Sequence, residues 1–421
     1  MIVIRNAQVL RAAGVEKTTV VIEGDTVESV GVDPAVNGAR VIEAGGAWLG
    51  PGLVDLHVHF RDPGQTWKED IESGARAASA GGYTAVVAMP NTEPPVDGGH
   101  SAAAAIDRAK TIDSLDLVVA GSLTQGRSGA GMADFDAMYE SGVRFFTDDG
   151  DTVPESGLLR RIMTYLRDLP GAVVAEHAED RSLTDRGHLN EGVISARHGI
   201  VGIPGVAEEV IVARDLALAA DTGARLHIQH VSTASSLRLI ERARETGTSV
   251  TCEVTPHHVA LDEEALEDLD PNLKMYPPLR AASDRAVLAE ALRQGWIDAV
   301  ATDHAPHTAA EKGVPFEEAP RGVIGLETAA PVICEVLGGD QAKFFDRMSV
   351  APARIAGLDR QGIAVEPGSP ANLVLFAPEL RWSAGHFASK SANSPFTGEE
   401  LTGRVLATIY EGRVSFEGGL R

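Results

Sequence analysis

The sequence predicts an α/β protein in which a TIM (β/α)8 barrel carries a small β-sandwich domain built from both chain ends. Three observations predict this fold. Apolar segments of strand length alternate with stretches of helical spacing through the middle of the chain. Eight such segments occur, and eight parallel strands close a barrel. Polar residues end nearly every segment, and only a closed sheet brings so many strand ends together.

The two ends of the chain have the pattern of short strands joined by turns. Segments 2–10 and 18–22 near the start, and 371–377 and 405–416 near the end, are rich in β-branched and other apolar residues. Neither end alone has many strands, so we expect the two ends to pair with each other. The predicted domains are 1–51 and 364–421 for the two parts of the β domain, and 52–363 for the barrel.

The barrel strands are expected wherever a short apolar segment ends in a polar residue. The strand candidates are 52–60, 83–90, 116–123, 142–148, 172–177, 225–231, 249–255 and 298–303. Between the first two, Thr66 and Glu69 form a capping-box pattern that predicts a helix start, and Gly81-Gly82 predicts its end. An open, doubly wound sheet is the alternative fold, and the convergence of polar strand ends favours the barrel over it.

Composition restricts the class of function. The 421 residues carry a net charge of −23, which disfavours nucleic acid as a partner because phosphate binding needs a basic surface. The two cysteines, Cys252 and Cys334, provide neither a disulfide framework nor a cysteine-based zinc site. The first residues lack the layout of a signal peptide, and no apolar run approaches the roughly 20 residues that span a bilayer. We therefore expect a cytoplasmic protein without a membrane segment.

Histidines and aspartates at the strand ends predict a metal centre. His57 and His59 lie two residues apart on one strand, so both imidazoles face the same side. Four further candidates each follow a different strand: Asp149, His177, His230 and Asp303. Imidazole and carboxylate groups suit zinc, with other divalent metals as substitutes. Three histidines and an aspartate could hold one ion, and a bridging carboxylate would allow two.

The chain resembles the dihydroorotase branch of the amidohydrolase superfamily, specifically the bacterial type I enzymes. The resemblance covers essentially the whole sequence and rests on motifs in a fixed order. These are Asp55-Leu56-His57-Val58-His59-Phe60-Arg61, Met89-Pro90-Asn91-Thr92, Thr147-Asp148-Asp149-Gly150, Glu176-His177-Ala178-Glu179-Asp180, Gln229-His230-Val231-Ser232 and Thr302-Asp303-His304-Ala305-Pro306-His307.

The resemblance implies reversible hydrolysis of the cyclic amide of dihydroorotate to N-carbamoyl-aspartate, in pyrimidine biosynthesis, by a metal-activated hydroxide. It assigns His57, His59 and Asp303 to one metal, and His177 and His230 to a second. Asp303 would also act as general acid and base. Asp149 is the expected bridge between the metals, since Asp148 would point away from the centre in a regular strand. A strand bulge would reverse that choice.

The resemblance also assigns residues to the substrate. Arg61 emerges beside His59, and its guanidinium fork matches the substrate carboxylate. The other substrate-binding residues that we expect are His59, Asn91, Tyr276, His307, Arg321 and Gly322. Two of these depart from the family pattern: Tyr276 stands where asparagine is usual, and Arg321 where phenylalanine is common.

Two alternatives remain open at this point. An allantoinase or hydantoinase would share the metal chemistry, but these typically keep a bridging lysine where this chain has Asp149. A non-catalytic, dihydroorotase-like subunit of aspartate carbamoyltransferase would not need the full set of ligands. The resemblance suggests a small-molecule substrate, a homodimer and an association with aspartate carbamoyltransferase as partners.

Overall fold

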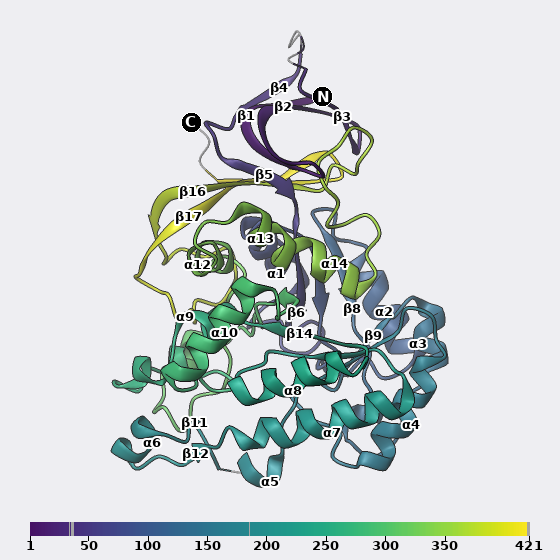
Figure 1. Cartoon of the computed structure of the whole chain (residues 1–421), viewed down its shortest axis with the longest axis vertical. Coiled ribbons are helices and arrows are strands. Elements are labelled where there is room, and N and C mark those ends of the chain that lie inside the picture. Colours follow the sequence, from purple (N-terminus) through teal and green to yellow (C-terminus); the bar gives the residue numbers. More distant parts are fainter. Residues whose placement is uncertain (33, 35–37, 185, 419–421) are drawn as a thin grey trace.

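The structure is a computed structural model that describes residues 1–32, 34, 38–184 and 186–418. Figure 1 shows two parts, a sheet at one end of the long axis and a larger body of strands and helices below it. The first strand of the chain, Ile2–Arg11, and the last, Arg413–Glu417, both belong to this sheet. Among the described residues, none of the helices combines the length and apolar character that crossing a membrane requires.

Strands from both chain ends form one eight-stranded sheet, in the order β18-β17-β16-β5-β1-β2-β3, with β4 beside β1. The ends meet where β5 pairs antiparallel with β16, placing Leu49 opposite Leu375. This pairing of the ends confirms the expectation from the sequence. The strands are Ile2–Arg11 (β1), Gly14–Glu23 (β2), Thr26–Val30 (β3), Arg40–Glu43 (β4), Trp48–Pro51 (β5), Leu373–Ser383 (β16), Glu400–Tyr410 (β17) and Arg413–Glu417 (β18). Apolar side chains from both ends share one buried cluster, so the sheet has its own core.

Among the described residues of the larger part, eight parallel strands make up the two main sheets, and each of the predicted segments holds one of them. They form a three-stranded sheet, β6-β7-β8, and a five-stranded sheet, β15-β14-β13-β10-β9. Isolated parallel bridges join the edges of these sheets, Gly121 to Phe146 on one side and Val58 to His304 on the other. The strands are Leu53–Val58 (β6), Tyr83–Ala88 (β7), Asp116–Val119 (β8), Phe145–Phe146 (β9), Val173–Glu176 (β10), Leu226–Ile228 (β13), Val250–Val254 (β14) and Ala299–Val300 (β15).

Helices connect these strands and cover them from outside, as α4, α7 and α8 do in Figure 1. The α-helices are Ile71–Ala80 (α1), Gly99–Ala109 (α2), Phe135–Ser141 (α3), Ser156–Arg167 (α4), Arg181–Thr184 (α5), Val193–His198 (α6), Val206–Thr222 (α7), Ala234–Glu245 (α8), Pro256–Ala260 (α9), Ala282–Gln294 (α10), Ala309–Lys312 (α11), Ala329–Val336 (α12), Gln341–Phe345 (α13) and Ala351–Ala356 (α14). A two-residue pair, Leu189–Asn190 (β11) and Gly202–Ile203 (β12), lies outside the main sheets. Apolar faces of the helices pack with the strands in one large buried cluster. The mixed α/β class is therefore confirmed.

The start of α1 corrects one prediction. The helix is capped by Asp70, which exchanges hydrogen bonds with Ser73, and not by Thr66 with Glu69. Glu69 is fully buried instead, and accepts hydrogen bonds from Ser73, Ser389 and His304. The long-range partners of a buried carboxylate outweigh a local cap worth about 1 kcal/mol. The helix ends at Gly81 as the sequence predicts.

The connection between β16 and β17, residues 384–399, leaves the sheet and packs on the larger part. Ser391 donates a hydrogen bond to the carbonyl of Lys68 at 2.8 Å. Asn393 accepts one from the backbone of His307 and donates to the carbonyls of Ala305 and Gly322. The C-terminal part of the chain thus reaches the loops that follow the parallel strands.

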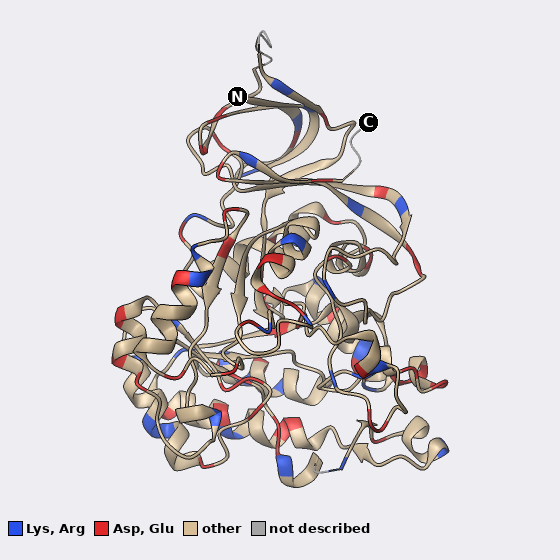
Figure 2. Ribbon diagram, turned by 180° about the vertical axis from the view of Figure 1, so that it is seen from behind, with Lys and Arg blue, Asp and Glu red and all other residues tan. Residues whose placement is uncertain are grey.

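Figure 2 shows acidic and basic residues interspersed along both parts of the molecule.

Candidate metal centre

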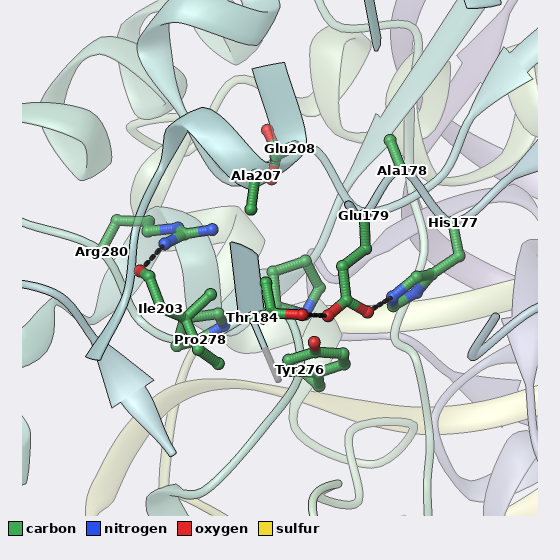
Figure 3. Close-up of a pocket in the computed structure, with 11 residues that line it drawn as sticks. His177, Ala178, Glu179, Thr184, Ile203, Ala207, Glu208, Tyr276, Pro278 and Arg280 are labelled. Atoms are coloured by element: carbon green, nitrogen blue, oxygen red, sulfur yellow. Dashed lines mark hydrogen bonds and ion pairs between the residues drawn. The ribbon is translucent and has the colours of Figure 1, made fainter. Parts of the chain in front are cut away.

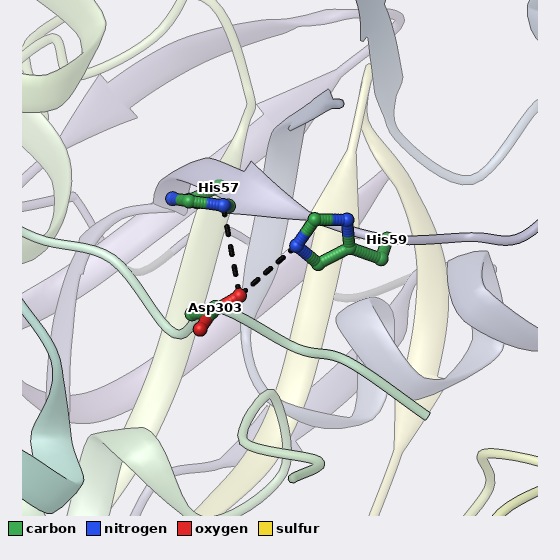
Figure 4. Close-up of side chains that lie close together, drawn as sticks. All are labelled: His57, His59 and Asp303. Carbon is green, nitrogen blue, oxygen red and sulfur yellow. Dashed lines mark hydrogen bonds and ion pairs between the residues drawn. The ribbon is translucent and has the colours of Figure 1, made fainter. Parts of the chain in front are cut away.

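His57, His59 and Asp303 converge at the ends of β6 and β15. Figure 4 shows the Asp303 carboxylate between the two imidazole rings. Its Oδ1 lies 3.0 Å from His59 Nε2 and 3.6 Å from His57 Nε2. All three residues are buried. Their donor atoms are close enough together to hold one metal ion.

Asp149 extends this group toward two more histidines. Its Oδ2 lies 3.2 Å from His57 Nε2 and 3.4 Å from His59 Nε2. Its Oδ1 lies 3.5 Å from His230 Nε2 and 3.7 Å from His177 Nδ1. One carboxylate therefore faces both halves of the predicted ligand set. Asp148 points elsewhere and accepts hydrogen bonds from Leu123 and Thr124, as expected if Asp149 faces the centre.

The unsatisfied atoms of this cluster fit a bound cation. His57 Nε2 and Asp149 Oδ1 are buried and have no hydrogen-bond partner within the described part of the chain. Burial favours the protonated form of Asp149, yet the neighbouring imidazoles, His57 foremost, hold its pKa well below the usual value. Two ionised carboxylates buried together require compensating positive charge. A divalent metal facing these imidazoles and carboxylates would provide that charge.

Outer residues fix which nitrogen of three of the imidazoles faces the centre. His57 Nδ1 lies 3.0 Å from Glu253 Oε1, and His177 Nε2 lies 3.3 Å from Glu179 Oε2. His59 Nδ1 lies 3.0 Å from Asn91 Oδ1. Each outer oxygen accepts the ring N–H, so the opposite nitrogen presents its lone pair to the centre. This carboxylate–histidine arrangement is usual for metal ligands.

Glu253 is a site residue that the sequence analysis missed. It lies on β14, is fully buried, and its second oxygen is 3.0 Å from His227 Nε2. Hydrogen bonds from His227 and His57 overcome its burial and lower the pKa of Glu253 to about 2. The one charged residue on this strand, Val250–Val254, could have signalled a buried partner.

Backbone strain also gathers at this centre. Asp303, His230 and Arg61 have φ values of 48°, 33° and 58°. Non-glycine residues adopt such values at a cost of about 1–3 kcal/mol, and they cluster at functional sites where the surrounding structure fixes them. Because of these φ values, the three side chains point in directions that a regular strand end would not give them.

A cavity of about 230 Å³ opens above the cluster. Its lining includes nearly all of the predicted substrate residues, namely His59, Arg61, Asn91, Tyr276, Arg321 and Gly322. A neighbouring pocket behind Tyr276, drawn in Figure 3, has only about 10 Å³ and is too small for a substrate. Figure 3 also shows the Glu179 carboxylate between His177 and Thr184. The larger cavity is therefore the candidate active site.

His307 has a different position from the other predicted substrate residues. It is buried and is not among the residues lining the cavity. Its Nε2 donates to the carbonyl of Arg321 at 2.8 Å, and its backbone N–H donates to Asn393. In this structure His307 fixes the cavity wall. Asn393 was also missed, and its sequence context gives no signal of this contact.

Comparison with known proteins shows which family the chain belongs to. Residues 46–236 match the family model described as Dihydro-orotase-like. The chain is similar to the dihydroorotase of Streptomyces coelicolor, with 43% identity over 424 residues, covering 99% of this chain and 98% of that one. The chain belongs to the dihydroorotase family. The dihydroorotase of Geobacter metallireducens is 42% identical over 408 residues, covering 96% of both chains.

The solved structures of similar fold are named hydantoinases, which also hydrolyse cyclic amides. An L-hydantoinase from Arthrobacter aurescens matches with a TM-score of 0.85 at 24% identity, over 100% of this chain and 97% of that chain. A D-hydantoinase from a Bacillus species matches with a TM-score of 0.85 at 26% identity, over 99% and 95%. The higher identity to dihydroorotases distinguishes this chain from the hydantoinase alternative.

Proposed function

We propose that this protein is a metal-dependent dihydroorotase that interconverts dihydroorotate and N-carbamoyl-aspartate. The observation that carries the proposal is the convergence of four histidines and two aspartates beneath a cavity whose wall presents Arg61 and Asn91. Membership of the dihydroorotase family supports the same reaction. The non-catalytic alternative would have no need of this complete, strained cluster.

We propose the closed TIM barrel as the scaffold of this site, with the domain boundaries at 51/52 and 363/364. The two bridges that join the edges of the parallel sheets support closure. The change from β5 to β6 between Pro51 and Leu53 supports the first boundary. The sandwich form of the small domain is supported by its shared apolar cluster.

We assign His57, His59 and Asp303 to one metal and His177 and His230 to another, with Asp149 between them. Zinc is our choice because imidazole and carboxylate donors suit it. A metal bound here would supply a hydroxide at neutral pH and polarise the ring carbonyl. The two-faced placement of the Asp149 oxygens supports the bridging assignment.

The protein's own groups position the substrate and move one proton. Arg61 would bind the substrate carboxylate through two charge-assisted hydrogen bonds. During hydrolysis the water oxygen bonds to the ring carbonyl carbon, the bond from that carbon to nitrogen breaks, and the nitrogen receives a proton. Asp303, whose Oδ1 faces His59 and His57, would take the proton from the water and deliver it to that nitrogen. Ring closure reverses these steps.

The test is hydrolysis of dihydroorotate by the zinc-loaded protein, with allantoin and hydantoin as competing substrates. We expect turnover of dihydroorotate but not of the other two rings, and a rate reduced by about 10²–10⁴-fold in Asp303→Asn. Turnover of another ring would assign the metal chemistry to a different substrate. Absence of turnover with metal bound would favour the alternative of a non-catalytic subunit.

The remaining assignments come from the family resemblance. We propose a cytoplasmic homodimer, and an association with aspartate carbamoyltransferase as a further interaction. Sedimentation of the purified protein, alone and mixed with that enzyme, tests both associations.

A further inference from the structure

Asp149, the proposed bridge between the metals, lies beyond the end of a very short strand. Strand β9 consists of Phe145 and Phe146. Among the described residues, the last backbone hydrogen bond that leaves this segment runs from the N–H of Thr147 to the carbonyl of Gly121, at 2.8 Å. Pairing with neighbouring strands therefore does not fix the direction of the Asp149 side chain, and other contacts must do so.

Arg127, from the loop that follows β8, holds the backbone on both sides of Asp149. Its Nη2 donates to the carbonyl of Asp148 at 3.0 Å and also to the carbonyl of Asp149. These two carbonyls belong to the peptide units that flank the Asp149 Cα. Because each peptide unit is planar, holding both of them fixes the two backbone dihedrals of Asp149. The direction of its side chain is fixed with them.

The turn that contains Asp149 wraps around the guanidinium group of Arg127. The N–H of Asp151 donates to the carbonyl of Asp148 at 2.9 Å, and the Asp151 carboxylate accepts from Arg127 at 3.0 Å. Gly150 has φ of +66°, a conformation that favours glycine, and a Cβ there would lie 3.8 Å from Arg127 Nη2. One guanidinium group thus meets three oxygens of a single turn.

The contact between the β8 loop and this turn is reciprocal. The Asp148 carboxylate accepts from the N–H groups of Leu123 and Thr124, at 2.8 and 3.1 Å, and from the Thr124 hydroxyl. The two neighbouring aspartates therefore have separate roles. Asp148 attaches the turn to the loop that carries Arg127, and Asp149 faces the histidines.

Arg127 itself has a strained backbone conformation. Its φ of 52° lies in the left-handed region, as do those of Asp303, His230 and Arg61 at the metal centre. Non-glycine residues keep such values where the surrounding structure fixes them, and these residues cluster at functional sites. Arginine suits the role described above because its guanidinium stays protonated and presents several N–H donors in one plane.

We propose that Arg127 is a positioning residue of the metal centre, which orients Asp149 so that one carboxylate faces both metal sites. The inference rests on the proposed function and its assignment of ligands to two metals. In that assignment the first site has three ligands besides the bridge, and the second site has two. Loss of the orientation of Asp149 should therefore weaken the second site far more than the first.

The experiment measures metal binding in the parent protein and in Arg127→Met. Manganese(II) is titrated into the metal-free proteins, and electron paramagnetic resonance follows the free ion and the spin coupling between bound ions. We expect two bound ions with spin coupling in the parent. In Arg127→Met the second ion should bind about 10–100-fold more weakly, the size usual for contacts that orient metal ligands, and the first should bind within about threefold of the parent. The coupled signal at two equivalents of added manganese should fall accordingly.

Arg144 provides a matched control, because it lies directly before β9 and its Nη1 also donates to two backbone carbonyls, of Tyr139 at 2.7 Å and of Val143 at 2.8 Å. Arg144→Met should leave both metal affinities and the spin coupling unchanged. Arg127→Lys keeps a charged donor and should recover part of the affinity for the second ion. If Arg127→Met does not fold, the same selective weakening is expected in Arg127→Lys, to a smaller extent.

Two results in the Arg127 variants would overturn the inference. Unchanged affinities would show that Asp149 is oriented without Arg127, and equal weakening of both ions would indicate a general structural role. A parent protein that binds a single ion would overturn the assignment of two metals and the inference with it. Failure of the proposed reaction is distinguishable, because it would appear as metal-loaded parent protein that does not turn over dihydroorotate, whatever the titration gives.

Discussion

Replacing Glu253 by glutamine should weaken metal binding although Glu253 itself does not face the centre. The carboxylate accepts from His57 Nδ1 and His227 Nε2, each at 3.0 Å, in a fully buried position. A glutamine amide offers one acceptor and one donor, so one imidazole must face an N–H group. Either a buried N–H donor is left without an acceptor, which costs about 1–3 kcal/mol of stability, or one imidazole changes its tautomer. If His57 changes, its Nε2 carries a hydrogen and cannot bind metal.

The expected loss in metal affinity is about 10–100-fold, or 1.4–2.8 kcal/mol. Competition between the protein and a chromophoric zinc chelator measures it, with thermal unfolding as a check on folding. Glu208→Gln is the control, because Glu208 is a buried glutamate that accepts from Ser232 and Thr233 and, among the described residues, forms no hydrogen bond or ion pair with a histidine. A folded Glu253→Gln protein with metal affinity within about threefold of the parent would refute the reasoning.

Three further predictions concern the cavity and its walls. Arg61→Met should raise the KM of dihydroorotate by about 10–100-fold while the metal content stays normal. Steady-state kinetics and metal analysis measure the two quantities. An unchanged KM would show that Arg61 does not bind the substrate. Asn393→Ala loses hydrogen bonds at 3.1–3.3 Å to three backbone groups, so urea unfolding should show a loss of about 1–3 kcal/mol, and equal stability would contradict the bracing role. Burial, with the charge of Lys274 adding to it, lowers the pKa of Lys312 to about 7 from 10.5. The unfolded chain then binds more protons there between pH 7 and 10.5, so this residue's contribution to stability rises with pH across that window. Lys312→Met should reduce the slope of the free energy of unfolding against pH by up to about 1.4 kcal/mol per pH unit. Equal slopes in the two proteins, measured by urea unfolding at several pH values, would contradict this prediction.

The sequence predicted the parallel strands well because each combines an apolar segment with a polar end. His57 and His59 illustrate why: spacing by two residues fixes a shared face without any knowledge of distant contacts. The orientation of Asp149 against Asp148 followed from the same alternation. These are local rules, and the structure obeys them at His57 and His59, whereas the positive φ values of His230 and Asp303 depart from them.

The features that were not predicted depend on contacts between residues far apart in the chain. Glu69 matched a local capping pattern, but its partners His304 and Ser389 lie more than two hundred residues away. The partnership of Glu253 with His57 and the contact of Tyr276 with Arg321 are likewise long-range. A side chain's partners in the fold override its local preference when burial makes an unmet polar group costly.

The return of the 384–399 segment to the larger part has a consequence for biosynthesis. The candidate metal ligands lie between His57 and Asp303, so a ribosome translates all of them well before Asn393. Domains generally fold in the order of synthesis, N-terminal parts first. A growing chain could therefore acquire metal before it has the residue that braces His307 and Gly322. Metal loading and competence for substrate would then be separate events in the life of the molecule, with the second waiting for the C-terminal strands.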